Sequence, residues 1–142
     1  MICTAVPREA VDIVWGDVSS MLNKAIETSG GKYHIDDIYQ HLTEGYYNLW
    51  LIIDEGKEEK VIAAITTRII QYPSRKAMAM DWIGGTRMTE WLPIAMDRLI
   101  SFAKDCDCSH LEGYGRKAWS KVLKKYNWNP EYIAYRMEIN NG

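Results

Sequence analysis

The sequence is short of phenylalanine and cysteine, carries no large excess of one charge, and has no long apolar run. It contains 1 Phe against 9 Tyr and 6 Trp, so most of its aromatic rings combine an apolar body with a polar tip. Its 3 cysteines are odd in number, and Cys106 and Cys108 lie only two positions apart, which argues against a disulfide scaffold. With 17 basic and 19 acidic residues, the chain lacks the positive excess that is typical of nucleic-acid-binding proteins.

Other absences narrow the class further. No apolar stretch approaches the ~20 residues that a membrane-spanning helix needs. The opening residues, MICTAVPREA, lack the basic and long apolar regions of a signal peptide, so we expect a soluble protein of a reducing compartment. Because the 142 residues show no repeat, low-complexity segment or linker, we expect a single domain, 1–142. Cys106, Cys108 and His110 lack a second pair at zinc-finger spacing, so we expect no metal.

Hydrophobic periodicity predicts a mixed α/β fold. Val11, Val18 and Leu22 recur at helical spacing, whereas the segment from Tyr132 to Ile139 alternates as a strand does. The predicted order is β-α-α-β-β-β-α-β-α-β, which gives a mixed sheet with hairpins and a β-α-β crossover. We expect strands at 2–6, 49–53, 61–70, 76–83, 109–114 and 132–139, and helices at 7–29, 35–44, 89–105 and 118–126.

Two segments carry a resemblance to a known family. Residues 81–91, DWIGGTRMTEW, read as a strand, a glycine pair and an amphipathic helix, and residues 122–128, VLKKYNW, read as a helix end before a final strand. Together with the element order, they resemble the GCN5-related N-acetyltransferase (GNAT) superfamily, and in particular small GNAT-like proteins that tailed phages encode. The resemblance covers nearly the whole chain and implies a central, mostly antiparallel mixed sheet with splayed strands flanked by helices.

The resemblance also implies acetyl-CoA as co-substrate, held by a glycine-containing loop and the helix after it. Helix N-termini carry unpaired N–H groups and partial positive charge, so phosphate groups bind there. The implied coenzyme-binding residues are Trp82, Ile83, Gly84, Gly85, Thr86, Arg87, Met88, Thr89, Arg116 and Trp119. The usual glycine spacing of the family is not met, and Leu123 stands where many members carry the tyrosine that protonates the leaving thiolate.

Acetyl transfer from a thioester to an amine needs one group that takes the amine's proton and another that protonates the thiolate. Asp81, on a strand face of small residues, and Glu112, at the tip of the next strand, are candidate bases, and each also suits a structural role. Tyr114, between two glycines, and Tyr126, one helical turn from Leu123, are candidate acids. Tyr126 suits the core as well.

The expected function is therefore transfer of an acetyl group from acetyl-CoA to the primary amine of a small molecule or peptide, by direct attack in a ternary complex. The alternative is a GNAT-fold phage protein without catalysis that serves as a virion component or binds a host protein. We expect no nucleic-acid and no membrane partner, leave a homodimer open, and expect a cytoplasmic location, in the host cytoplasm if a phage encodes the chain.

Overall fold

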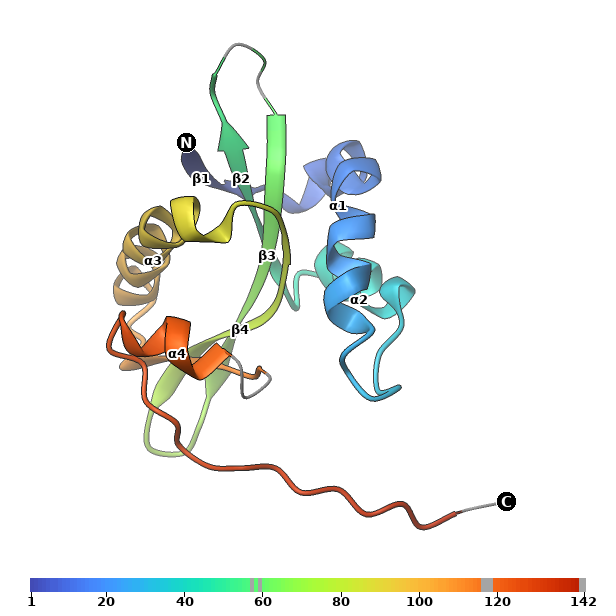
Figure 1. Cartoon of the computed structure of the whole chain (residues 1–142), viewed down its shortest axis with the longest axis vertical. Coiled ribbons are helices and arrows are strands. Elements are labelled where there is room, and N and C mark those ends of the chain that lie inside the picture. Colours follow the sequence, from blue (N-terminus) through green and yellow to red (C-terminus); the bar gives the residue numbers. More distant parts are fainter. Residues whose placement is uncertain (57, 59, 116–118, 141–142) are drawn as a thin grey trace.

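Five strands and four α-helices make up the described part of the chain, residues 1–56, 58, 60–115 and 119–140, in a computed structural model (Figure 1). The strands are β1 (Ile2–Val6), β2 (Asn48–Asp54), β3 (Lys60–Gln71), β4 (Lys76–Gly85) and β5 (His110–Gly113). The helices are α1 (Val11–Ile26), α2 (Ile35–Thr43), α3 (Met88–Asp105) and α4 (Trp119–Lys124), and a 3-10 turn, Arg8–Ala10, precedes α1. The predicted mixed α/β order is confirmed through α4.

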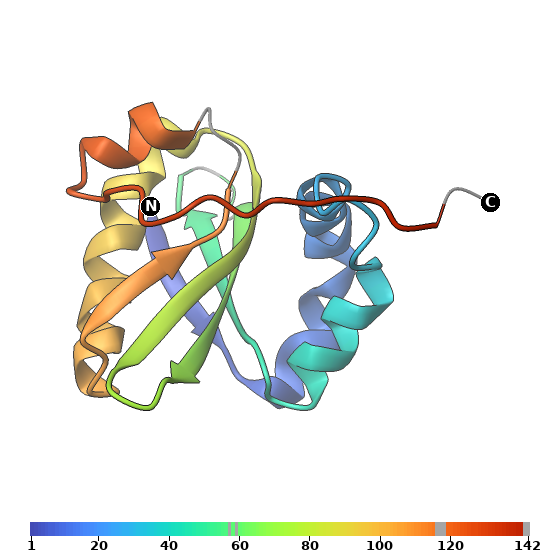
Figure 2. The same cartoon turned by 90° about the horizontal axis from the view of Figure 1, so that it is seen from below.

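The strands form one sheet in the order β1-β2-β3-β4-β5, with helices on both faces (Figure 2). Neighbouring strands are antiparallel except β4 and β5, which run parallel because α3 connects them. α1 and α2 cover one face, and α3 covers the other. None of the described helices is long and apolar enough to cross a membrane.

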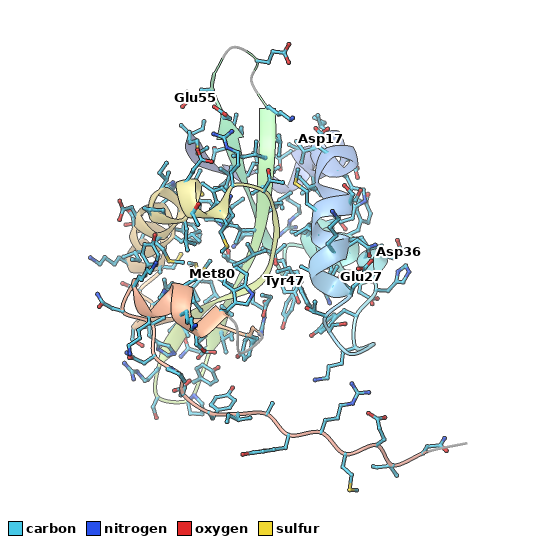
Figure 3. The ribbon with its side chains drawn as sticks, in the orientation of Figure 1. Asp17, Glu27, Asp36, Tyr47, Glu55 and Met80 are labelled. Carbon is cyan, nitrogen blue, oxygen red and sulfur yellow. The ribbon has the colours of Figure 1, made fainter. Side chains whose placement is uncertain are left out.

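The helices of the α1–α2 layer are amphipathic, as their sequence spacing predicts. Val18 and Leu22 of α1 are fully buried against the sheet. Figure 3 shows the acidic side chains of Asp17 and Asp36 on the outer side of the same two helices. The buried side of this layer fixes where α1 lies along β3 and β4.

The core on the α3 side of the sheet is built around two tryptophans. Trp50 and Trp91 are 0% and 1% exposed. The indole N–H of Trp50 donates to the Thr67 hydroxyl at 2.9 Å, and that of Trp91 donates to the Thr86 carbonyl at 2.8 Å. The single polar atom of each buried ring therefore has a hydrogen-bond partner, which offsets the cost of removing that atom from water.

β4 changes its neighbours along its length, and this opens the sheet. The register between β3 and β4 slips by one residue at Asp81, which is the extra residue of a β-bulge. β5 pairs with β4 only as far as Met80. Beyond that point β4 continues to Gly85 while β5 has already ended, so the two parallel strands separate.

The prediction of a final strand from Tyr132 to Ile139 is wrong. Residues 129–140 belong to no strand, and each of them is exposed. Alternating hydrophobicity indicates that a segment suits a sheet, but a strand forms only where a neighbouring edge offers backbone partners. Here the segment runs away from β5 and past the connection between α1 and α2 (Figures 1 and 2).

Candidate active site

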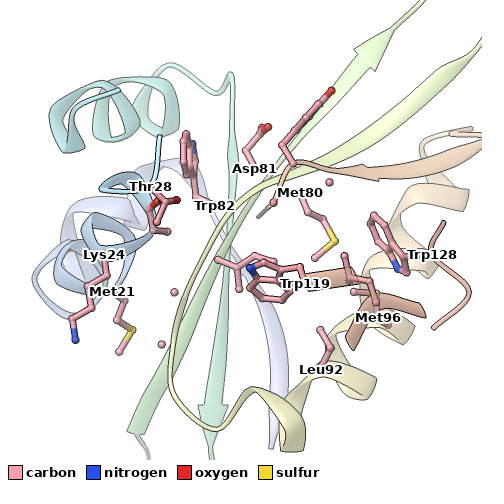
Figure 4. Close-up of a pocket in the computed structure, with 18 residues that line it drawn as sticks. Met21, Lys24, Thr28, Met80, Asp81, Trp82, Leu92, Met96, Trp119 and Trp128 are labelled. Atoms are coloured by element: carbon pink, nitrogen blue, oxygen red, sulfur yellow. The ribbon is translucent and has the colours of Figure 1, made fainter. Parts of the chain in front are cut away.

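A cavity of about 290 Å³ lies where β4 and β5 separate (Figure 4). α1 lies on one side of it, and α3, α4 and the residues after α4 lie on the other. Its walls are mainly apolar and aromatic. The lining residues are Met21, Lys24, Ala25, Thr28, Met80, Asp81, Trp82, Ile83, Gly84, Gly85, Leu92, Met96, Gly113, Tyr114, Gly115, Trp119, Leu123 and Trp128.

The predicted coenzyme-binding residues divide into three groups. Those that line the cavity are Trp82, Ile83, Gly84, Gly85 and Trp119. Beyond the cavity, around the start of α3, lie Thr86, Arg87, Met88 and Thr89. Arg116 lies outside the described residues. The structure thus brings half of the predicted residues to one cavity. The residues predicted to bind the phosphate groups lie outside it, around the start of α3.

The glycine pair continues β4 instead of forming a loop after it. A Cβ atom on Gly84 would overlap the backbone of Met21 in α1, and one on Gly85 would overlap the backbone of Ile62 in β3. Gly85 also has φ +132°, a conformation that residues with a Cβ rarely adopt. Close approach of neighbouring backbone therefore explains both glycines.

Arg87 precedes α3 and is bound to two carboxylates. Its Nη1 atom donates to Asp54 at 2.6 Å, and its Nε atom donates to Glu90 at 2.7 Å. These hydrogen bonds hold the pKa of both carboxyls below their ordinary values, so both acids stay charged at neutral pH. Arg87 can bind a phosphate only if it releases or shares these partners.

Asp81 lies between the cavity and a second pocket of about 430 Å³. Its carboxylate accepts hydrogen bonds from Arg68 of β3, from Nε at 2.6 Å and from Nη2 at 3.3 Å. The Asp81 side chain is only 9% exposed. Both of its oxygens bind a guanidinium, which gives up no proton at neutral pH, so Asp81 fits a structural role better than a proton-accepting one.

Glu112 of β5 is the centre of a hydrogen-bond cluster. Tyr72 and Tyr114 donate to its Oε2 atom at 2.8 and 2.9 Å, and His110 Nε2 lies 2.8 Å from its Oε1 atom. Burial pushes the pKa of Glu112 upward, but the hydrogen bonds outweigh burial and hold this pKa below its ordinary value. The carboxylate is therefore charged at neutral pH.

Tyr114 connects this cluster to both cavities, because it lines each of them. Burial and the hydrogen bond to Glu112 raise the pKa of Tyr114, so its phenol stays protonated. Tyr126, the other predicted acid, packs against the α3-side core and is not among the described residues that line either cavity. Tyr114 is thus the predicted acid that lies at the cavities.

Several residues at the two cavities were not predicted. Three of them form one flank of α1 and a fourth follows the end of this helix, but their spacing alone does not show that this flank faces β4; they are Met21, Lys24, Ala25 and Thr28. Arg68 lines the second pocket, and Tyr72 belongs to the cluster around Glu112 without lining either cavity. They stand 13 and 40 positions from their partners Asp81 and Glu112, so no local pattern connects them. Among the described residues, no group of three or more His, Cys, Asp or Glu side chains could hold a metal ion.

No family model and no curated protein sequence matches this chain. Solved structures do match it. A probable acetyltransferase has a TM-score of 0.70 at 10% identity and covers 100% of both chains. The ribosomal-protein-alanine N-acetyltransferase from Brucella melitensis biovar Abortus 2308 has a TM-score of 0.67 at 12% identity, over 98% of this chain and 100% of that one. An aminoglycoside acetyltransferase from an uncultured soil metagenomic sample, in complex with sisomicin, has a TM-score of 0.66 at 6% identity, over 97% of this chain and 95% of that one.

These matches extend over nearly the whole of each chain, whereas the identities of 6% to 12% are too low to carry residue roles from one protein to another. What the matches show is the overall fold, which in this chain is a mixed sheet with one parallel pair and helices on both faces. A GNAT family acetyltransferase of Staphylococcus aureus subsp. aureus USA300_TCH1516 also matches, with a TM-score of 0.63 at 12% identity over 97% of this chain and 98% of that one. This chain therefore has the fold of the GNAT acetyltransferases.

Proposed function

We propose that the chain is an N-acetyltransferase that moves an acetyl group from acetyl-CoA to a primary amine by direct attack in a ternary complex. The observation that carries the proposal is the cavity between the separating strands β4 and β5, with Tyr114 shared between it and a second pocket. Two adjoining spaces suit a reaction with two substrates. The fold adds support, although a fold by itself does not determine an activity.

The cavity fits the thioester arm of acetyl-CoA better than its phosphates. From Asp81 to Gly85, none of the described strands pairs with one edge of β4, so the backbone groups of this edge are available to the amides of the arm. Apolar side chains such as Leu92 and Met96 suit the methylene groups. At the far end, the N-terminus of α3 offers unpaired N–H groups, but Arg87 beside it already binds two carboxylates. When bound, acetyl-CoA supplies an acetyl group activated as a thioester.

The reaction forms a C–N bond and breaks a C–S bond, and the amine must lose a proton. Glu112 is charged and in contact with Tyr114, so we assign it as the proton acceptor, with Tyr114 between it and the amine. Leu123 lines the cavity but has no proton to give. The proton therefore returns through Tyr114 to the departing thiolate, and the transfer leaves no net charge on the protein.

The second pocket is the acceptor side of this proposal. Most of its lining residues carry a polar group on the side chain; they are Thr28, Ser29, Lys32, Tyr33, Arg68, Asp81, Trp82, Tyr114 and Gly115. One structural neighbour is named for alanine of a ribosomal protein and another for aminoglycosides, so amines of peptides and of small molecules both have precedent in this fold. We assign an amine-bearing small molecule or peptide to this pocket.

Calorimetry and thermal unfolding with acetyl-CoA and CoA test the proposal. A ligand at a hundred times its Kd is expected to stabilise the folded chain by ~2.7 kcal/mol. Release of free thiol in the presence of a panel of amines then identifies the acceptor. If millimolar CoA gives neither a heat of binding nor a thermal shift, the proposed enzymatic function is contradicted.

A second candidate is a GNAT-fold phage protein without catalysis that acts as a virion component or binds a host protein. The cluster of Arg87, Asp54 and Glu90 favours it, because two carboxylates lie near the helix end that would receive a pyrophosphate. Absence of CoA binding, together with co-purification with phage particles or a host protein, would support it. Either candidate would act in the cytoplasm, that of the host if a phage encodes the chain.

A further inference from the structure

The last described segment, residues 129–140, has the pattern of an amphipathic strand, and its apolar side is exposed. Ile133, Tyr135, Met137 and Ile139 alternate along it and are 73%, 90%, 82% and 90% exposed. The residues between them are Ala134, Arg136 and Glu138. A row of large apolar side chains on one side of an extended segment is typical of a surface that another surface covers.

This segment begins beside β5 and then leads away from it. Trp128 packs on the α3-side core and lies against Gly113 at the end of β5. The chain then crosses the molecule to the connection between α1 and α2, where Arg136 Nη1 donates to the Gly30 carbonyl at 2.7 Å (Figures 1 and 2). Pro130 stands at the start of the segment. It fixes its own φ and favours an extended residue before it, so the chain does not reverse toward β5 at this point.

β5 offers the kind of edge that the segment lacks. It is the last strand of the sheet and pairs only with β4 among the described strands, so the backbone along its outer edge has no strand beside it. Its two faces differ in character. Leu111 packs on the α3-side core, whereas His110 and Glu112 belong to the polar cluster. A strand with one apolar and one polar side complements such an edge.

One antiparallel register matches both faces. It places Arg136 opposite Glu112 and, two residues away, Glu138 opposite His110. Residues opposite each other in an antiparallel pair lie on the same face of the sheet. The guanidinium then meets a carboxylate, and the apolar row falls on the face of Leu111. Glu138 lies beside His110, whose two ring nitrogens already face Ser109 and Glu112.

We propose that two copies of the chain exchange these segments, each adding residues 131–139 as an antiparallel strand to β5 of the other copy. The β5 edge receives the segment of a second copy, because the segment points away from β5 of its own chain and ends beyond α1 and α2 in both views. Reciprocal exchange is closed, since each copy gives one strand and receives one. The received strand lies beside Glu112, so each copy completes the wall next to the other's polar cluster. The exchange does not depend on the proposed activity.

Light scattering on the full chain after size-exclusion chromatography tests the dimer. The wild-type chain is expected at twice its monomer mass over a wide range of concentration. Tyr135→Lys places a charge in the apolar row and is expected to give a folded monomer, with its fold checked by circular dichroism. Ala134→Lys adds the same charge on the opposite side and is the matched control, expected to remain dimeric. A monomeric wild-type chain, or a Tyr135→Lys variant that stays dimeric, overturns the exchange.

Cross-linking between two different variants tests the strand pairing itself. In a background with Cys106 and Cys108 replaced by serine, one chain carries Ser109→Cys and the other carries Ile139→Cys, which the proposed register places opposite each other. Opposite residues of an antiparallel pair lie within the range of a disulfide. Co-expression of the two chains is expected to give a covalent dimer that neither variant gives alone. Failure of the co-expressed pair to cross-link under oxidising conditions overturns the proposed pairing.

Discussion

One hydroxyl group connects the charged cluster on β5 with the two cavities. Tyr114 lines both cavities and donates to Glu112 at 2.9 Å. Tyr114→Phe keeps the aromatic wall but removes the proton path, so we expect kcat to fall by ~10²–10⁴ while the Kd for CoA changes little. Thiol-release kinetics and calorimetry measure the two quantities. Tyr126→Phe, in the core, is the matched control and is expected to keep its rate; an unchanged rate in Tyr114→Phe removes Tyr114 from the reaction.

Glu112 also links the stability of the fold to pH. Its pKa is lower in the folded chain than in an unfolded one, so its hydrogen bonds stabilise the fold above the unfolded pKa, and this contribution is lost as pH falls through the folded pKa. We expect Glu112→Gln to lower the free energy of unfolding by about 1–3 kcal/mol at neutral pH. The difference from wild type is expected to shrink in acid.

Denaturant unfolding at a series of pH values measures this difference. Glu27→Gln removes an exposed glutamate by the same substitution and is expected to leave stability unchanged at each pH. A difference between Glu112→Gln and wild type that stays constant from neutral to acidic pH would show that the charge of Glu112 does not stabilise the fold.

The contact between α1 and β4 depends on one glycine. A Cβ atom on Gly84 would overlap the backbone of Met21, which cannot move without shifting α1. We expect Gly84→Ala to lower the free energy of unfolding by about 1–3 kcal/mol. Gly16→Ala is the matched control in α1 itself: a Cβ there meets nothing within 4 Å, and we expect it to stabilise the helix by about 0.5–1 kcal/mol. Equal melting temperatures for the two variants would contradict this account.

The elements that bury one face could be predicted from the sequence, because burial imposes the periodicity that the sequence displays. Val18 and Leu22 mark α1 in this way, and the predicted helix and strand bounds agree with the structure within a few residues through α4. The segment 132–139 has an equally clear pattern, yet it forms no strand in the structure. A pattern reports what a segment could cover, and whether a partner edge is present is a property of the whole fold.

The candidate site was predictable only in part, for a related reason. Glu112 and Tyr114 could be found because they stand at the end of a predicted strand, where Tyr114 lies between two glycines. Their partner Tyr72 could not, since it is 40 residues away from Glu112. Similarly, Asp81 was predicted as either a base or a structural acid, and its ion pair with Arg68 of the neighbouring strand depends on the register between β3 and β4. Sheet register, which no local pattern fixes, decides which polar groups meet.

Across the whole molecule, the tryptophans divide between the core and the cavity. Trp50 and Trp91 are fully buried, whereas Trp82, Trp119 and Trp128 line the cavity between β4 and β5. An aromatic side chain with a polar tip suits both places, because its ring packs against apolar groups while its N–H can bind a partner, as those of Trp50 and Trp91 do. The indole nitrogen of Trp82 is an exception, since it is buried without a hydrogen-bond partner among the described residues. The cavity tryptophans come from β4, α4 and the chain after α4. Their fluorescence emission is therefore sensitive to a ligand that contacts any of these parts.

Binding of acetyl-CoA is therefore expected to change the intrinsic tryptophan emission, because the ligand displaces water from the rings that line the cavity. Trp119→Phe keeps an aromatic wall but removes one reporter, and we expect it to reduce the change in emission. Trp15→Phe is the matched control: Trp15 packs edge-on against Tyr39 of α2 and is not among the described residues that line the cavity, so the change in emission is expected to persist. Fluorescence titration should give the same Kd as calorimetry. If calorimetry detects binding while the emission of the wild-type chain stays constant, acetyl-CoA binds elsewhere on the molecule.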